Sequence, residues 1–354
     1  MAFKDFMEME KPWKYNFEFE CGDENYKALP AFKRYFTYKI SPEATAYDSA
    51  NQFIIDHFGY SPICDPDGSG KGYYTLIHEI YNALWRWEKD KNSTFGTLKG
   101  KPDICEFGAD TMNSVQTALG LTIEPNRWGN RSFYWTLECW CKDRETYENK
   151  WKSMAAEEYI ETYHTLGNFV LVPKWFNGDR GTKLYLDRNE ETPGYVWSKE
   201  DGGYYKKVDD FWDLSLEYLY DNGFHKKINK STVNFDKEMF DWYINYFFLW
   251  DYVEDKGECY KPKHIAIKEN GERDFTEFFK TSTELILRRG KFMTAMQMLK
   301  QDDYHKLQSG IFDTSTIYSG FDSVISEIEK KISLNDSAKA IMDGLKNKEG
   351  FRGI

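Results

Sequence analysis

Residues 163–173 read YHTLGNFVLVP and mark a change in the pattern of the chain. The preceding residues, 151–164, are typical of a helix, and Gly167 can end that helix. The run Phe169–Val172 is rich in β-forming residues and stops at Pro173, which indicates a short strand. This stretch therefore predicts a helix, a tight turn and a strand in direct succession.

Most of the remaining pattern is helical. In the segment Tyr73–Glu88, for example, Ile77, Ile80 and Leu84 recur at the three- and four-residue spacing of a helix. Further helices are expected at Tyr47–Phe58, from Asp110 to Leu119, and at Asp209–Asp221, Asp236–Val253, Phe275–Leu299, Ser319–Ile332 and Asp336–Leu345. The aromatic run Phe133–Cys141 is expected to be buried, without a period that decides between helix and strand. The sequence predicts a mainly α fold with a small central β element (α+β) and a helical C-terminal region.

The domain organisation is inferred from one segment without clean periodicity. Residues 188–205 carry Pro193 and several glycines, so they are expected to form a loop or a domain junction. A chain of 354 residues, at roughly 150 residues per domain, suggests about two domains. We therefore expect a mixed α/β region at 1–187, which contains the HTLGN motif, and a helical region at 206–354.

Composition limits the classes of protein to which the chain can belong. Aromatic residues make up 18% of it, so the core is expected to rest on aromatic packing. The net charge of −11 disfavours a broad electrostatic grip on nucleic acid or an anionic membrane. Only a local contact with nucleic acid stays open, because Arg127 and Arg131 flank Trp128 and could stack a base. Small basic clusters such as residues 288–291 are typical of solvated helix faces.

Localisation and metal binding follow from what the sequence lacks. No stretch reaches the roughly 20 apolar residues of a membrane helix, and residues 1–11 lack the apolar core of a secretory signal. The six cysteines are scattered and have no second Cys/His pair at metal-ligand spacing. We therefore expect a cytoplasmic protein with reduced thiols, without a membrane segment and without a structural metal site.

The HTLGN motif carries the candidate functional residues. A histidine at the end of a helix lies where the backbone partial charge is negative, which favours imidazolium. Gly167 allows the chain to reverse, and Asn168 can satisfy loose backbone groups. A four-residue strand spans only about 13 Å, so the polar turn after it can return towards the histidine. The expected cluster is His164, Asn168, Asn177, Asp179 and Arg180.

This arrangement resembles the second half of the HNH-type C-terminal domain of modification-dependent restriction enzymes. There, a His-x-x-Gly-Asn-Leu-x-Leu-Leu stretch is followed by an Asn several residues later. The chain is also similar to a group of small uncharacterised bacterial proteins with His-Thr-Ile-Gly-Asn, a strand, a turn with Gly and Arg, and an Asp-Leu-x-Leu-Glu helix. Residues 213–217, DLSLE, would supply that last element here.

The resemblance implies metal-assisted phosphodiester hydrolysis in host–phage conflict. His164 would act as base or metal ligand, Asn168 and Asn177 as orienting groups, and Asp179 and Arg180 in binding. A divalent metal is expected as cofactor only under this interpretation.

One part of the nuclease pattern is missing from the chain. In the HNH-type nuclease domain, the first strand carries an Asp/Glu-His-Ile-x-Pro stretch, and the His of that stretch acts as general base on water. Upstream of His164 the histidines are His57 and His78, and neither stands in such a stretch. The similarity therefore indicates a degenerate HNH-like module.

The residues themselves leave two alternatives to an enzyme. In the first, His164 is only a helix-terminal residue and Gly167 a C-cap. In the second, the chain is a non-enzymatic acidic inhibitor or regulator whose aromatic surface binds a protein partner. Aromatic residues are favoured at interface hot spots, and a charge of −11 suits a basic partner.

Overall fold

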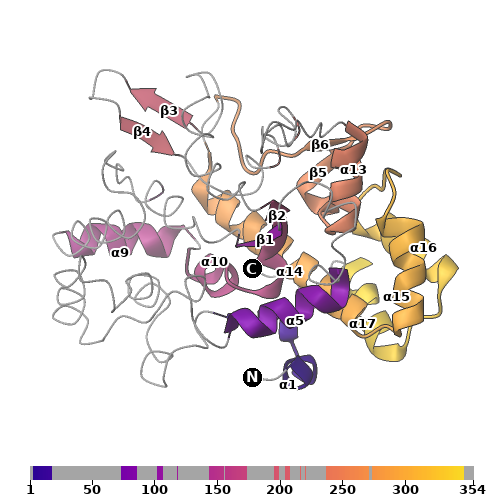
Figure 1. The fold of residues 1–354 in the computed structure, drawn as a ribbon. Coiled ribbons are helices and arrows are strands. Elements are labelled where there is room, and N and C mark those ends of the chain that lie inside the picture. The colour runs from indigo at the N-terminus through magenta and orange to yellow at the C-terminus, as the bar shows by residue number, and fades with distance from the viewer. Residues whose placement is uncertain are drawn as a thin grey trace.

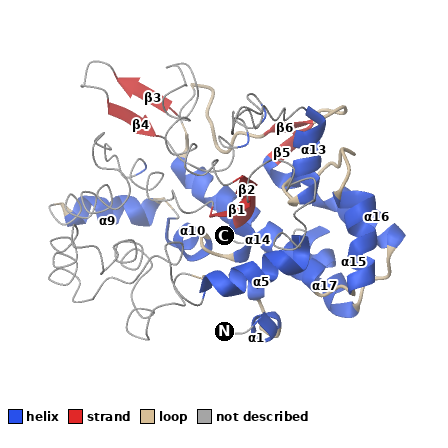
Figure 2. Ribbon diagram, viewed as in Figure 1, coloured by secondary structure: helices blue, strands red, loops and turns tan. Residues whose placement is uncertain are grey.

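The fold is mainly α with small antiparallel β elements, as the sequence predicts (Figure 2). The computed structural model of the chain describes residues 3–17, 73–85, 102–106, 118, 143–154, 156–173, 195–198, 204–207, 216, 220, 237–270 and 273–346.

A long helix, α14 (Phe275–Gln297), runs through the middle of the molecule (Figure 1). It contacts elements from both ends of the chain. On its N-terminal side in the sequence these are α5 (Tyr73–Trp85), α10 (Ala156–Thr162) and the 3₁₀ turns η1 (Pro12–Lys14) and η4 (Leu166–Asn168). On its C-terminal side it packs against α17 (Asp336–Lys346).

The other elements surround this framework. The remaining helices are α1 (Phe3–Met7), α9 (Arg144–Ser153), α13 (Lys237–Tyr246), the 3₁₀ turn η5 (Trp250–Tyr252), α15 (Gln301–Leu307), the π-helical η6 (Gln308–Phe312) and α16 (Phe321–Lys331). Among the described helical elements, the sequence pattern did not predict α1, η1, most of α9, α15 and η6.

Three antiparallel strand pairs complete the described fold. They are β1 (Pro102–Glu106) with β2 (Phe169–Pro173), β3 (Tyr195–Ser198) with β4 (Tyr204–Lys207), and β5 (Val253–Asp255) with β6 (Tyr260–Pro262). In the first pair Glu106 lies opposite Phe169, and Pro102 lies opposite Pro173. The strand expected at Phe169–Val172 is confirmed as β2.

Two expected helices have different bounds in the structure. The helix expected at 151–164 is divided, because α9 ends at Ser153 and α10 begins at Ala156. The Trp151 indole N–H donates to the Glu157 carboxylate over 2.8 Å and thereby ties the two helices together across the break. The helix expected at 236–253 stops at Tyr246, and Phe248 then adopts a positive φ of 60°. This backbone strain is offset by complete burial of the Phe248 ring.

The segment expected as a loop or junction contains regular structure. Residues 195–198 and 204–207 form the β3–β4 hairpin, in keeping with the β preference of their tyrosines, valine and tryptophan. Hydrophobic residues before and after this segment belong to one cluster, from Phe6 to Leu345. The predictions for 47–58, 133–141 and most of 110–119 and 209–221 lie outside the described residues, although residues 118, 216 and 220 are helical.

Aromatic rings dominate the core, as the composition predicts. The buried Trp250 ring lies 5.3 Å from Phe292, 5.4 Å from Phe321 and 5.6 Å from Phe248, measured between centroids. These rings come from three different segments, so this contact group joins α14, α16 and the residues after α13.

One buried amide organises the polar contacts next to this core. Asn245 accepts hydrogen bonds from the Trp250 indole N–H at 2.7 Å and the Tyr260 hydroxyl at 2.8 Å. Its amide group donates to the carbonyls of Thr314 and Thr316, each over 2.8 Å. All four hydrogen-bonding positions of the side chain are therefore used inside the protein.

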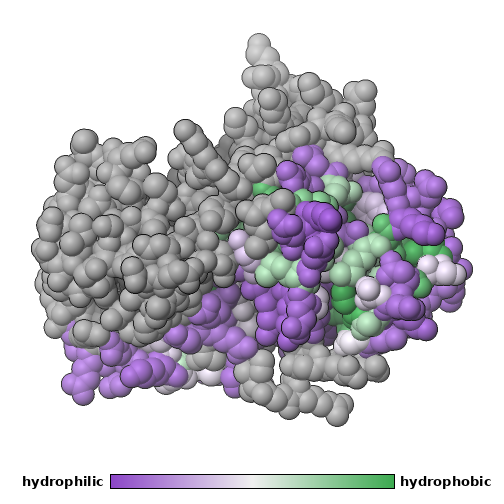
Figure 3. Space-filling model, turned by 90° about the horizontal axis from the view of Figure 1, so that it is seen from below, coloured by the Kyte–Doolittle hydropathy of each residue, from purple (hydrophilic) through white to green (hydrophobic). Residues whose placement is uncertain are grey.

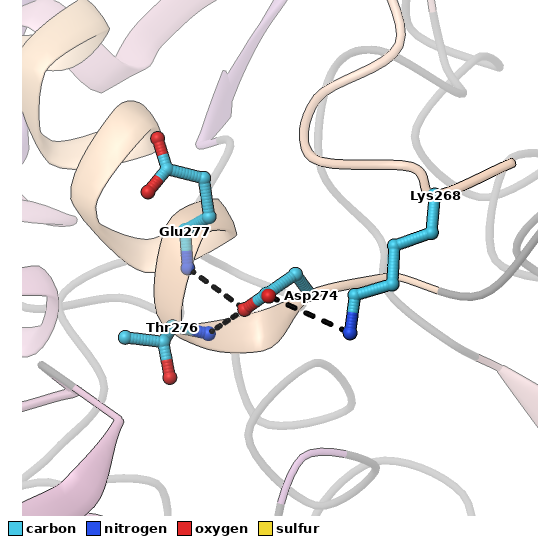
Figure 4. Close-up of polar contacts among 4 residues, drawn as sticks. All are labelled: Lys268, Asp274, Thr276 and Glu277. Atoms are coloured by element: carbon cyan, nitrogen blue, oxygen red, sulfur yellow. Dashed lines mark hydrogen bonds and ion pairs between the residues drawn. The ribbon is translucent and has the colours of Figure 1, made fainter.

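The start of α14 is fixed by a charged cap. Asp274 accepts hydrogen bonds from the backbone N–H groups of Thr276 at 3.1 Å and Glu277 at 3.2 Å (Figure 4). Lys268 lies 3.5 Å from the same carboxylate. The bond from the Glu277 N–H is the largest cause that lowers the pKa of Asp274, and Lys268 adds to it.

We expect the substitution Asp274→Ala to lower the free energy of unfolding by about 1 kcal/mol, because it leaves two N–H groups of α14 without their acceptor. Denaturant unfolding measures this loss. Because the folded-state pKa is lowered, the contribution is present above the unfolded pKa and is lost as pH falls through the folded one. The matched control is Lys268→Ala, which removes an exposed ion pair and should change stability little. Equal stability of the two variants at neutral pH would contradict the assignment.

Candidate functional site

The structure places two of the five residues of the expected cluster. His164 lies two residues after the end of α10, and Asn168 is the last residue of η4. Asn177, Asp179 and Arg180 lie outside the described residues, so their expected return to His164 stays a prediction. We refer to residues 163–169 as the His164 turn.

The His164 imidazole is enclosed by aromatic rings. Only 1% of the His164 surface is exposed to solvent. The ring centroid lies 4.0 Å from that of Tyr163 and 6.3 Å from that of Phe169, the latter in a stacked arrangement. The residue is also bound through its backbone, because its carbonyl accepts a hydrogen bond from the Phe17 N–H over 3.0 Å.

The electrostatics of His164 differ from the expectation of an imidazolium. Burial lowers its pKa well below the ordinary 6.5, so the ring is neutral at pH 7. The expectation rested on the negative end of a helix, but α10 ends at Thr162 and the loss of hydration outweighs that weak field. A neutral imidazole shielded from solvent is poorly placed to take a proton from a substrate or water.

Asn168 performs the local task that the sequence predicts. Its side-chain amide donates to the Tyr163 carbonyl over 2.6 Å, and its backbone N–H donates to the Thr165 carbonyl over 3.0 Å. The Tyr163 carbonyl belongs to the end of the helical segment, where carbonyls have no partner within the helix. Asn168 thus closes the turn from inside.

Gly167 has a different role from the expected C-cap or chain reversal. Its φ is not positive, unlike those of Gly257 and Gly320. A Cβ at this position would lie 1.8 Å from the Ile286 carbonyl oxygen and 2.7 Å from the Gly290 nitrogen. The residue is therefore needed for close approach of the turn to the backbone of α14.

Arg289 is the residue of this site that sequence reasoning missed. It is fully buried, and its Nε donates to the Phe247 carbonyl over 2.9 Å. Its Nη1 donates to the carbonyls of Gly167, over 2.8 Å, and Phe169. The basic run 288–291 was expected on a solvated face, but both arginines of this run are buried. The neighbouring Gly290, which lets another segment approach, is the signal that could have indicated contact.

Together these contacts make the His164 turn a joint between segments. Gly167 brings the turn onto α14, Arg289 binds the carbonyls on either side of Asn168, and Asn168 closes the turn. Within the described ranges, no group of three His, Cys, Asp or Glu residues could hold a metal ion.

The close approach gives a direct test. We expect Gly167→Ala to lower the free energy of unfolding by about 3 kcal/mol, because the added methyl group overlaps the backbone of α14. Chemical denaturation monitored by tryptophan fluorescence measures the change. Gly344→Ala is the control, since a Cβ there meets nothing within 4 Å and alanine favours the helix. Unfolding of Gly167→Ala at the wild-type denaturant concentration would exclude the close contact.

Comparison with known proteins adds no relative to this description. No family model, curated protein or solved structure matches the chain. In the part of the chain that the structure describes, no helix is both long and apolar enough to cross a membrane. The resemblance of residues 163–177 to the HNH-type domain therefore stays a prediction. The functional proposal below rests on the geometry of the His164 turn.

Proposed function

We propose that the chain is a non-enzymatic acidic protein that binds a basic protein partner. The observation that carries this proposal is the enclosure of His164 between Tyr163 and Phe169, with 1% of the residue exposed. The motif that most resembles an active centre is used to join the turn to α14. This leaves molecular recognition as the function that the chain's composition supports best.

The charge of the chain supports a basic partner. A net charge of −11 attracts a basic protein at long range and accelerates its association. The same charge repels nucleic acid and so disfavours the nuclease-type interpretation.

Half-buried apolar side chains on the C-terminal helices supply a surface for contact. Met298 and Leu299 follow α14, while Leu334 and Ile341 lie before and within α17. The Asn335 side chain donates to the Met298 carbonyl over 2.7 Å, which brings the first and last parts of this group together. Seen from below, hydrophobic residues lie at the surface among hydrophilic ones in the right-hand half of the molecule (Figure 3). Methionine adapts to varied partners, which suits such a surface.

The first test asks whether the chain cleaves nucleic acid. Purified protein is incubated with DNA and RNA in the presence of Mg²⁺, Mn²⁺ or Zn²⁺, and we expect no cleavage above background. His164→Phe is the matched variant, because it keeps an aromatic ring at this position while it removes both ring nitrogens; circular dichroism checks its fold. Metal-dependent cleavage by the wild type that the folded variant lacks would overturn the proposal.

The second test measures binding. A protein captured on the immobilised chain is purified and titrated at two salt concentrations, and we expect a stoichiometric complex whose association slows as salt rises. Ile341→Ser should weaken binding, whereas Ala340→Ser on the exposed side of α17 should not. A salt-independent association rate, or equal affinities of the two variants, would contradict a basic partner at this surface.

A further inference from the structure

We infer that the His164 turn is an acid-sensitive latch, which holds the N-terminal residues 12–17 to α14 while the imidazole is neutral and releases them when it is protonated. This inference is independent of the proposed binding function, because it concerns the coupling of segments within the chain.

The N-terminal segment is attached at and next to His164. The Phe17 N–H donates to the His164 carbonyl over 3.0 Å, and the Asn16 amide donates to the Glu161 carbonyl over 2.9 Å. The Phe17 ring meets the Phe169 ring edge-on at a centroid distance of 5.7 Å. The segment is thus connected to the residue that can change charge and to the ring that stacks on it.

Further contacts of the same segment reach α14. The Trp13 Cβ lies 3.1 Å from the position of a Cβ on Gly290, and the Lys291 ammonium lies 5.9 Å from the centre of the Trp13 ring. The turn itself touches Gly290 through Gly167. Movement of the turn away from α14 would therefore disturb both attachments of the N-terminal segment.

Burial makes protonation of His164 unfavourable, and the described elements around it carry a few charged groups. From α14, the buried Arg289 guanidinium already places a positive charge against the carbonyls of Gly167 and Phe169. Lys14 of η1 and Glu161 of α10 are exposed, and Glu158 of α10 is half-buried. Burial is the resolved cause that lowers the pKa of His164, so none of these acids offsets it.

The direction of the pH effect follows from the difference between the pKa of His164 in the closed turn and its pKa in the open turn. A histidine whose pKa is lowered in the closed turn and ordinary in the open one binds more protons when the turn opens. The closed form is therefore favoured fully above a pH of about 6.5 and loses about tenfold in its equilibrium constant per pH unit below it, down to the pKa of the closed turn.

The test is hydrogen exchange between pH 7 and pH 4.5, corrected for the intrinsic pH dependence of amide exchange, in the wild type and in His164→Phe. We expect the protection of the Phe17 amide to be constant above a pH of about 6.5, to fall by up to about tenfold per pH unit below it in the wild type, and to stay constant throughout in the variant. Equal pH dependence of this amide in both proteins would overturn the latch.

A second comparison within the wild type separates release from global unfolding and does not need the variant to fold. The Ile332 N–H donates to the Ile328 carbonyl at the end of α16, remote in sequence from the turn. We expect this amide to keep its protection while that of Phe17 is lost. Parallel loss of protection at both amides would contradict a local latch.

Discussion

The structure depends on the contact between two backbones, at Gly167 of the His164 turn and Gly290 of α14. Neither residue has a side chain, so the turn lies directly on the helix. The Arg289 guanidinium donates hydrogen bonds to the carbonyls of the turn and of Phe247 instead of to water. Since a buried charge is costly unless its hydrogen bonds are made, this residue fixes where the turn, β2 and the end of α13 meet.

The position of His164 follows from this constraint. With the turn pressed on α14 and Asn168 bonded to the Tyr163 carbonyl, the imidazole is directed among the rings of Tyr163 and Phe169. The residue types that suggest catalysis are thus also the types that close a tight, buried turn. The chemistry of a motif depends on its exposure to solvent as much as on its residues. That exposure is determined by contacts with residues that are distant in the sequence.

Local features of the fold could be predicted from the sequence. The periodicity of residues 275–299 predicts α14, and the run at 169–172 predicts β2. The hydrogen bond of the Asn168 side chain could also be predicted, because it joins residues that are close in the sequence.

The remaining features depend on tertiary contacts. Gly167 resembles a helix stop until Gly290 is placed beside it, and Arg289 resembles a surface residue until three carbonyls are found around it. No glycine or proline lies between α9 and α10 to indicate that the helix is divided there. These positions were missed because residues distant in sequence determine them.

The central claim, that the His164 turn is a buried joint, is tested most directly by the reactivity of individual histidines. Diethyl pyrocarbonate acylates accessible neutral imidazoles, and mass spectrometry reports the extent at each position. At pH 7 the exposed His264 should be modified while the protein stays folded, and His164 should react only once the chain is unfolded in denaturant. Modification of His164 in the folded protein at the rate of His264 would contradict the account.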